Sequence, residues 1–126
     1  MTNLPVFDLD FMLRANQDPD YSARMRLRYN VLRKLLLDND LVLEECIRKF
    51  SAENEWPRID EMDLNLEGRC LLWGGAIDRW FNGHDRGREI ENTTVFEREL
   101  RKLGEIGARK FLRNTNYYNF HGDEIG

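Results

Sequence analysis

His84 and Asp85 are the residue types from which some metal-dependent phosphohydrolases build their sites. Such a site needs several further histidine or carboxylate ligands. The chain contains one other histidine, His121, so the sequence argues against metal catalysis of this kind and predicts a polar loop after a helix end. An enzyme that uses His84 and Asp85 remains a third hypothesis, which requires a pocket holding both with a further acid or base.

The cysteines and one acidic segment suggest other chemistry. Cys46 and Cys70 lie within apolar helical patterns, where thiols are usually inert, and we expect both to be reduced. Residues 63–68, DLNLEG, match the first half of a calcium loop, but the position that should supply a bidentate glutamate holds Gly74. The sequence therefore predicts no catalytic residue, no metal site and no cofactor.

Basic residues cluster between positions 24 and 34, where five of them occur without an acidic residue. Arginine binds phosphates in pairs through its forked guanidinium, so a helix over residues 20–37 is a candidate nucleic-acid surface. Arg24 and Arg28 lie nearer the apolar stripe of this helix and suit internal ion pairs. The candidates assigned to the opposite side are Arg26, Arg33 and Lys34. The net charge of −4 weighs against this alternative.

Two further segments carry segregated charge. Residues 53–67 contain six acidic residues and one basic residue, and residues 78–91 mix both signs densely. Charged loops on a rigid helical body often recognise partners, although a solvated connector has the same composition. The predicted partner-binding residues are Glu53, Glu55, Asp60, Glu61, Asp63, Asp78, Arg79, His84, Asp85, Arg86 and Arg88.

Helices are expected to position these side chains. Apolar residues recur at helical spacing from Tyr21 to Leu36, and Asp18-Pro19 is a typical helix start. A short helix is predicted over residues 7–15 with Phe7 and Phe11 pointing inward. Another is predicted to end near Ser51 after placing four residues inside: Leu43, Cys46, Ile47 and Phe50.

The stretch WGGAIDRWFNGHD, residues 73–85, sets two glycines between tryptophans. No strand precedes it and no lysine follows it, so a helix over residues 66–81 is predicted rather than a phosphate-binding loop. Because a helical glycine costs about 1 kcal/mol against alanine, we expect a neighbouring helix or a large ring to approach Gly74 and Gly75 closely. Gly83 is predicted to end this helix in the left-handed conformation.

The last predicted helix opens with a capping box formed by Thr94 and Glu97. Gly104 and Gly107 are predicted to bend this helix or to split it into two. The tail that follows is aromatic, which indicates packing against the body of the protein or docking on a partner. Its aromatic residues are Tyr117, Tyr118 and Phe120.

These elements predict an all-α fold, a compact single-domain bundle of five or six helices over residues 1–126. The N-terminus lacks the pattern of a signal peptide, and no segment approaches the ~20 apolar residues of a membrane span, so we expect a cytoplasmic protein without membrane contact. The predicted core consists of Met25, Tyr29, Leu32, Leu36, Leu43, Ile47, Phe50, Trp73, Ile77, Trp80, Leu100 and Leu103.

The segments 74–82, GGAIDRWFN, and 103–108, LGEIGA, resemble a family of small helical bacterial proteins that includes a DNA mimic. In that family a Gly-Gly pair, a polar residue, paired aromatics and Asn close one helix, and a later helix ends in Leu-x-x-Ile-Gly-Ala. The similarity covers about a quarter to a third of the chain. It departs from the pattern by an extra residue after the glycines and a longer stretch between the motifs. The resemblance implies a binding role and no enzyme, while 19 basic residues argue against DNA mimicry over the whole surface.

The leading hypothesis is therefore a non-enzymatic protein-binding module of bacterial or phage type, such as an inhibitor, an immunity protein or a regulatory adaptor. Its partner is expected to be a protein held by the two charged surfaces. The alternative is a nucleic-acid-binding protein that uses the arginine-rich helix over residues 20–37.

Overall fold

The computed structural model describes residues 5–52, 54–84 and 89–113. The chain divides into two compact units, which we name the N-terminal unit (Met1–Asn65) and the C-terminal unit (Leu66–Gly126). Helices predominate in the described residues, which confirms a mostly helical fold, and one small two-stranded sheet was not expected. No helix in the described part is both long and apolar enough to cross a membrane.

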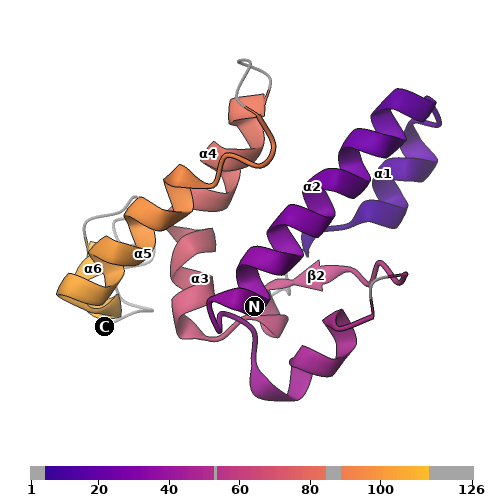
Figure 1. Ribbon diagram of the computed structural model, residues 1–126. Coiled ribbons are helices and arrows are strands. Elements are labelled where there is room, and N and C mark those ends of the chain that lie inside the picture. The colour runs from indigo at the N-terminus through magenta and orange to yellow at the C-terminus, as the bar shows by residue number, and fades with distance from the viewer. Residues whose placement is uncertain (1–4, 53, 85–88, 114–126) are drawn as a thin grey trace. The chain divides into compact units, whose positions relative to one another are not determined.

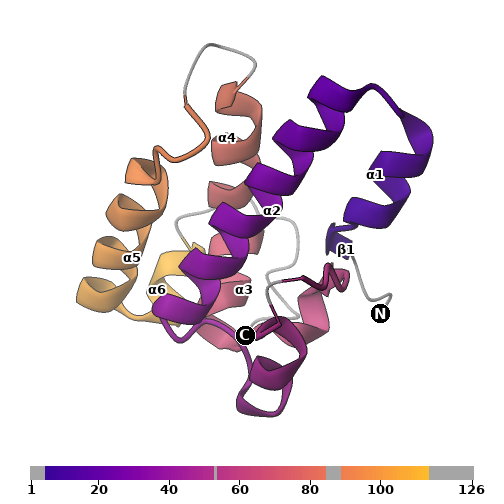
Figure 2. The ribbon, with the colours of Figure 1, turned by 45° about the vertical axis from the view of Figure 1, so that its right-hand side comes forward.

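The N-terminal unit is built around one long helix, α2 (Pro19–Asp38). Asp18 caps it by accepting a hydrogen bond from the Tyr21 amide, and Pro19 occupies its first turn, as the sequence predicts. The shorter α1 (Leu9–Ala15) lies alongside the first half of α2 (Figures 1 and 2). Met25, Tyr29, Leu32 and Leu36 of α2 are buried, so the predicted stripe is confirmed.

Strands β1 (Pro5–Phe7) and β2 (Ile59–Asp60) pair antiparallel in this unit. Helix α1 therefore begins later than predicted, at Leu9, and Phe11 is 61% exposed, so its predicted inward position is wrong. Leu9 and Phe7 are buried instead. Asp8 caps α1 by accepting a hydrogen bond from the Phe11 amide, which fixes the start of the helix at Leu9.

The rest of the N-terminal unit is formed by two 3₁₀ helices, η1 (Glu44–Phe50) and η2 (Glu61–Asp63). A 3₁₀ helix has three residues per turn, so the positions that share a side differ from those of an α-helix. Phe50 is buried as predicted, whereas Ile47 is 40% exposed and its predicted core position is wrong. Leu43 is only half-buried.

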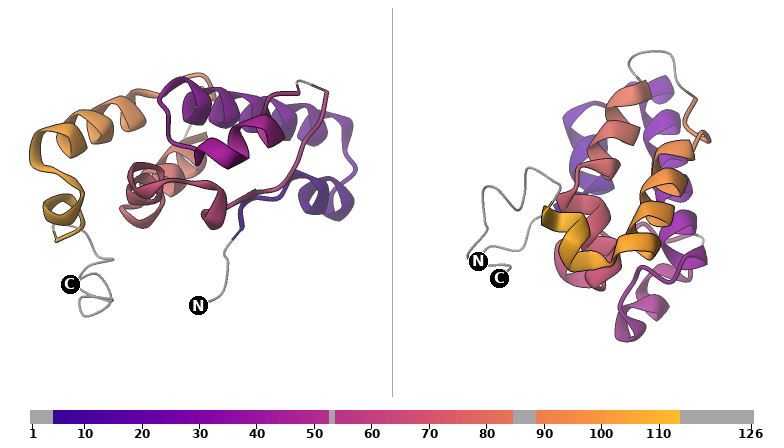
Figure 3. Two further views of the ribbon diagram at one scale, coloured as in Figure 1. Left: turned by 90° about the horizontal axis from the view of Figure 1, so that it is seen from below. Right: turned by 90° about the vertical axis from the view of Figure 1, so that its left-hand side faces the viewer.

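The C-terminal unit contains α3 (Leu66–Trp73), α4 (Ala76–Gly83), α5 (Thr94–Ile106) and α6 (Ala108–Arg113). Helix α5 packs along α4, and α6 turns away from the end of α5 (Figure 3). Ile77, Trp80 and Leu103 are buried as predicted, while Trp73 and Leu100 are half-buried.

The prediction of a single helix over residues 66–81 is wrong, because the helix is interrupted between α3 and α4. Gly75 has φ of 85°, a left-handed conformation that ends the right-handed path of α3. A Cβ on Gly74 would lie 3.0 Å from the Phe111 ring, which confirms the expected approach of a large ring to bare backbone. Leu66, the first residue of the predicted helix, is 56% exposed.

Two predicted helix ends also differ. Gly83 is the last residue of α4, with His84 as its cap, and Gly83 has no left-handed φ. Thr94 is the first helical residue of α5, and the cap, Thr93, makes no side-chain capping bond, so the predicted capping box is wrong. The Thr94 amide instead donates to the Asn92 side chain. The predicted split at Gly107 is confirmed, with φ of 83° between α5 and α6. The aromatic tail lies outside the described residues.

Candidate functional site

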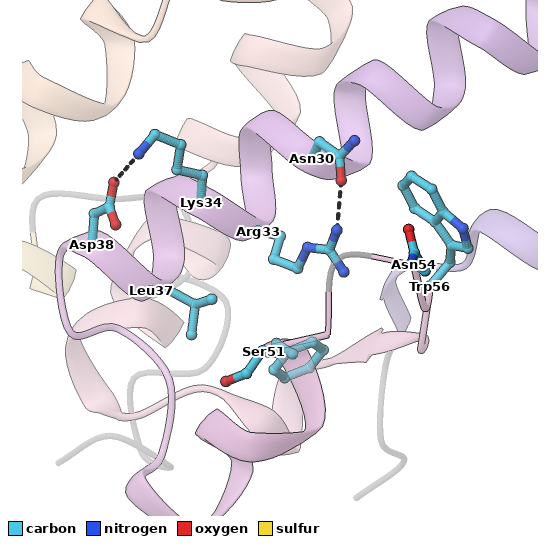
Figure 4. A pocket seen from close by; sticks show the side chains of 9 residues that line it. Asn30, Arg33, Lys34, Leu37, Asp38, Ser51, Asn54 and Trp56 are labelled. Atoms are coloured by element: carbon cyan, nitrogen blue, oxygen red, sulfur yellow. Dashed lines mark hydrogen bonds and ion pairs between the residues drawn. The ribbon is translucent and has the colours of Figure 1, made fainter.

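A groove of about 620 Å³ lies in the N-terminal unit between α2 and the segment that follows η1 (Figure 4). Its α2 side presents amide, basic, acidic and aliphatic side chains. Its other side presents an aromatic ring at each end, with a hydroxyl and an amide between them. The lining residues are Asn30, Arg33, Lys34, Leu37, Asp38, Phe50, Ser51, Asn54 and Trp56.

Arg33 forms the fixed wall of this groove. Its Nη1 donates to the carbonyl oxygens of Ala52 (3.1 Å) and Glu55 (2.6 Å), and its Nη2 donates to Oδ1 of Asn30 (2.6 Å). The side chain is only 7% exposed. A buried guanidinium needs such acceptors, because leaving its N–H groups without partners costs more than the bonds contribute. Arg33 therefore ties a connecting segment to the middle of α2.

Two aromatic rings enclose the same guanidinium. The Arg33 Cζ lies 5.0 Å from the centre of the Tyr29 ring and 5.3 Å from that of Trp56, both within the range of cation–π attraction. The two rings meet edge to face at 5.4 Å. Trp56 is half-buried, so one part of its indole is held by Tyr29 and Arg33 while another lines the groove.

Tyr29 adds a third backbone tie, because its hydroxyl donates to the carbonyl oxygen of Pro57. Burial raises the pKa of Tyr29 to about 12, although the nearby Arg33 charge acts in the opposite direction. The phenol therefore stays a donor at neutral pH. Together, Tyr29 and Arg33 bind three carbonyl groups of the segment, and the groove is preformed.

The rim of the groove is polar and exposed. Lys34 and Asp38 form an ion pair on the surface of α2, with Nζ 2.9 Å from Oδ2. Ser51 donates its hydroxyl to the Ile47 carbonyl, which commits it to the end of η1. Asn30 and Asn54 are exposed and offer amide groups that both donate and accept. This arrangement favours recognition of polar backbone over proton transfer.

The predicted acidic surface over residues 53–63 is wrong in part, because two of its members are buried. Glu61 is 6% exposed and Asp63 is 7% exposed. Asp63 accepts from Nζ of Lys49 at 3.0 Å and from the amide of Asp60 at 2.8 Å. Its carboxylate thus closes η2 and joins it to η1, since a buried charge requires partners of this kind.

The other members of that surface are placed differently. Asp60 is half-buried and pairs with Nε of Arg58 at 2.7 Å. Glu55 is exposed, and its backbone carbonyl is one of the acceptors of Arg33. Glu53 lies outside the described residues.

The predicted mixed-charge surface over residues 78–91 is described only at its ends. Asp78 is exposed in the first turn of α4. Arg79 donates to the Gly74 carbonyl and pairs with Glu99 of α5 at 3.0 Å, so it holds elements of the C-terminal unit together. The His84 ring packs edge to face on Trp80 at 4.8 Å. The remaining candidates, Asp85, Arg86 and Arg88, lie outside the described residues.

The nucleic-acid candidates on α2 do not form one basic surface. Arg33 is buried, so its predicted placement on the polar side is wrong. It lies four residues after Tyr29, and this spacing could have placed it on the same face of the helix as that buried ring. Lys34 is paired with Asp38. Arg26 is exposed as predicted, and Arg28 is buried, in agreement with its position near the apolar stripe.

No group of three or more histidine, cysteine, aspartate or glutamate side chains within residues 5–52, 54–84 and 89–113 could hold a metal ion. Both cysteines are free. Cys70 is buried, and burial together with the nearby Glu67 carboxylate raises its pKa to about 11. Desolvation, followed by the neighbouring Asp63, also raises the pKa of the half-buried Cys46. Both shifts disfavour the thiolate that a nucleophile requires.

The groove itself was not predicted from the sequence. The pairing of Trp56 with Arg33 could not be read from their positions, which are 23 residues apart. Comparison with protein-family models, with curated proteins and with solved structures gives no match to this chain. The resemblance to the family with a DNA mimic stays a prediction.

Proposed function

We propose that this chain is a non-enzymatic protein-binding module whose groove in the N-terminal unit accepts an extended segment of a partner protein. The observation that carries the proposal is the preformed wall in which Arg33, fixed by three acceptor oxygens, lies against Trp56. A preformed site loses little conformational entropy on binding, which favours affinity.

The composition of the groove supports a polypeptide as the occupant. Tryptophan, tyrosine and arginine dominate the binding energy of protein interfaces, and polar rims surround them. Trp56 supplies apolar area, while the amides of Asn30 and Asn54 match the donors and acceptors of a peptide backbone. The ionisable residues of the lining are one pair, Lys34–Asp38, and the fixed Arg33, which favours binding over acid–base chemistry.

We also propose that the chain acts as an inhibitor, an immunity protein or a regulatory adaptor of bacterial or phage type. It would do so as a single compact bundle of five or six helices with a cytoplasmic location. The exposed charge of Glu55, on the segment that borders the groove, would contribute at the edge of such a partner interface.

Selection of peptides from a random library on the full-length protein tests the proposal. The selected peptides should shift the NMR signals of the Trp56 indole N–H and of the Asn30 and Asn54 side-chain amides. Trp56→Ala should weaken their binding by about tenfold or more, equivalent to about 1.4 kcal/mol.

Phe11→Ala provides a matched control, because Phe11 is an aromatic residue of the same unit that is 61% exposed and does not line the groove. It should leave binding unchanged. Peptides that bind equally well to wild type and Trp56→Ala, or a library that yields no binder, would contradict the proposed role of the groove.

A further inference from the structure

A second surface lies in the C-terminal unit, where α5 ends and α6 begins. Residues 101–113 contain five basic residues and one acidic residue, Glu105, although the whole chain is acidic. All five basic side chains are exposed: Arg101, Lys102, Arg109, Lys110 and Arg113. We name these five residues the α5–α6 basic surface.

The fold brings Lys102 and the three α6 cations close together. Gly107, with φ of 83°, turns the chain between the two helices. Phe111 anchors α6 by packing into a cluster with Cys70 and Leu103. Residues three and four positions apart share one side of a helix, so Arg113 lies on the same side as Arg109 and Lys110.

The end of α5 continues the same surface. The Lys102 ammonium lies 6.0 Å from the centre of the Phe111 ring, so its charge is beside α6. A hollow of about 460 Å³ lies at the corner, with Ile106, Gly107 and Ala108 as its apolar part and three α6 residues as its basic part: Arg109, Lys110 and Arg113. The cations that border this hollow all belong to α6, and the Lys102 ammonium of α5 lies beside that helix.

We propose that the α5–α6 basic surface binds the phosphate backbone of double-stranded nucleic acid. Three of its five cations are arginines, whose planar forks bind phosphate oxygens in pairs. Among the side chains whose exposure is described, a set that leaves out residue 112, the large apolar ones that are exposed all lie outside α5 and α6. A protein partner would need such an anchor, and the charge complementarity therefore favours phosphates over an acidic protein.

The same observations favour paired over unpaired nucleic acid. Single strands bind through bases that stack on aromatic side chains. The aromatic residue of this surface, Phe111, is 2% exposed and packs inward. Backbone contacts alone recognise a duplex by its charge and shape, without reading its sequence.

Fluorescence anisotropy with labelled DNA and RNA duplexes of mixed sequence, measured at several salt concentrations, tests this proposal on the full chain. Neutralisation of about three to five phosphates predicts that log K falls with log salt at a slope of about −3 to −4. The triple variant Arg109→Gln/Lys110→Gln/Arg113→Gln should bind at least about tenfold more weakly and reduce the slope by about 2–3. Comparison of the two duplexes shows which source of phosphates is preferred.

The matched control removes three exposed cations of the other unit that do not line the groove, in Arg24→Gln/Arg26→Gln/Arg48→Gln. It should retain wild-type binding and slope. Should the triple variant on α6 unfold, as judged by its thermal transition, the single variant Lys110→Gln should still lower the slope by about 1.

Three results would overturn the proposal. These are no duplex binding by the wild type at low salt, equal losses in the control and the α6 triple variants, or binding to polyglutamate or to single strands as tight as to the duplex. None of these readouts depends on Trp56, so failure of this surface and failure of the peptide groove are distinguishable.

Discussion

Arg33 in the N-terminal unit and Phe111 in the C-terminal unit have comparable tasks, because each holds a short segment against a longer helix. Arg33 does so through hydrogen bonds to carbonyl oxygens and contacts with two rings. Phe111 does so by placing an apolar ring against the bare backbone of Gly74. The first contact is directional and costs desolvation, whereas the second depends on close packing.

The same contrast extends to each unit as a whole. The four charged side chains that are buried within the described chain all belong to the N-terminal unit: Arg28, Arg33, Glu61 and Asp63. The C-terminal unit buries apolar residues around Trp80, Phe96 and Cys70. Loss of a polar group should therefore damage the N-terminal unit, and changes of volume or of thiol ionisation should damage the C-terminal unit.

The largest effect is expected for Arg33→Leu. Leucine fills part of the space but leaves the carbonyls of Ala52 and Glu55 and the Asn30 side chain without their donor. The free energy of unfolding should fall by about 3 kcal/mol. Urea denaturation measures this loss, and hydrogen exchange should locate it in residues 1–65.

Arg26→Leu is the matched control, because Arg26 is an exposed residue of the same helix. It should change stability by no more than about 0.5 kcal/mol. If Arg33→Leu lowers the free energy of unfolding by less than about 1 kcal/mol, the hydrogen bonds of Arg33 do not stabilise the N-terminal unit as proposed.

The next effect concerns Cys70 at alkaline pH. Its pKa is about 9 as a free thiol and about 11 in the folded protein, so the unfolded chain loses this proton first. Its contribution to stability is therefore complete below pH 9 and is lost as the pH rises through 11. The two-unit difference corresponds to at most about 3 kcal/mol.

Urea denaturation at successive pH values should show that wild type loses more stability over this range than Cys70→Ala. The difference between the two proteins isolates Cys70 from Tyr29, whose pKa is also raised, to about 12. Parallel curves for the two proteins would show that the C-terminal unit does not protect its thiol.

The smallest effects come from one substitution made at two glycines of the C-terminal unit. A Cβ at Gly74 would lie 2.9 Å from the Cys70 carbonyl oxygen and 3.0 Å from Phe111, so Gly74→Ala should cost about 1–2 kcal/mol. Gly104 lies exposed within α5 with no atom within 4 Å of such a Cβ, so Gly104→Ala should stabilise by about 0.5–1 kcal/mol. Thermal unfolding compares the two, and changes of equal sign would refute the packing role of Gly74.

The parts of the fold that could be predicted are those fixed by local chemistry. Asp18-Pro19 started α2, apolar spacing placed Tyr29 inside, and Gly107 split the last helices as expected. Each of these features depends on residues within one or two helical turns.

The parts that could not be predicted depend on contacts between distant segments. The sequence treats Glu61 and Asp63 as surface charges, because nothing local shows that Lys49 and the Asp60 amide will pair with Asp63. The break at Gly75 was missed for a different reason. Apolar spacing continues across it, while the left-handed turn is set by how α3 and α4 pack.

The Arg33 contacts have one consequence for how the groove could diversify. Its acceptors on the connecting segment are backbone oxygens, which every amino acid possesses. Side chains at positions 54 and 55 can therefore be exchanged without removing the bonds that hold the segment. Single surface substitutions at this rim can therefore change which partner binds during evolution, while the contacts that hold the backbone stay the same.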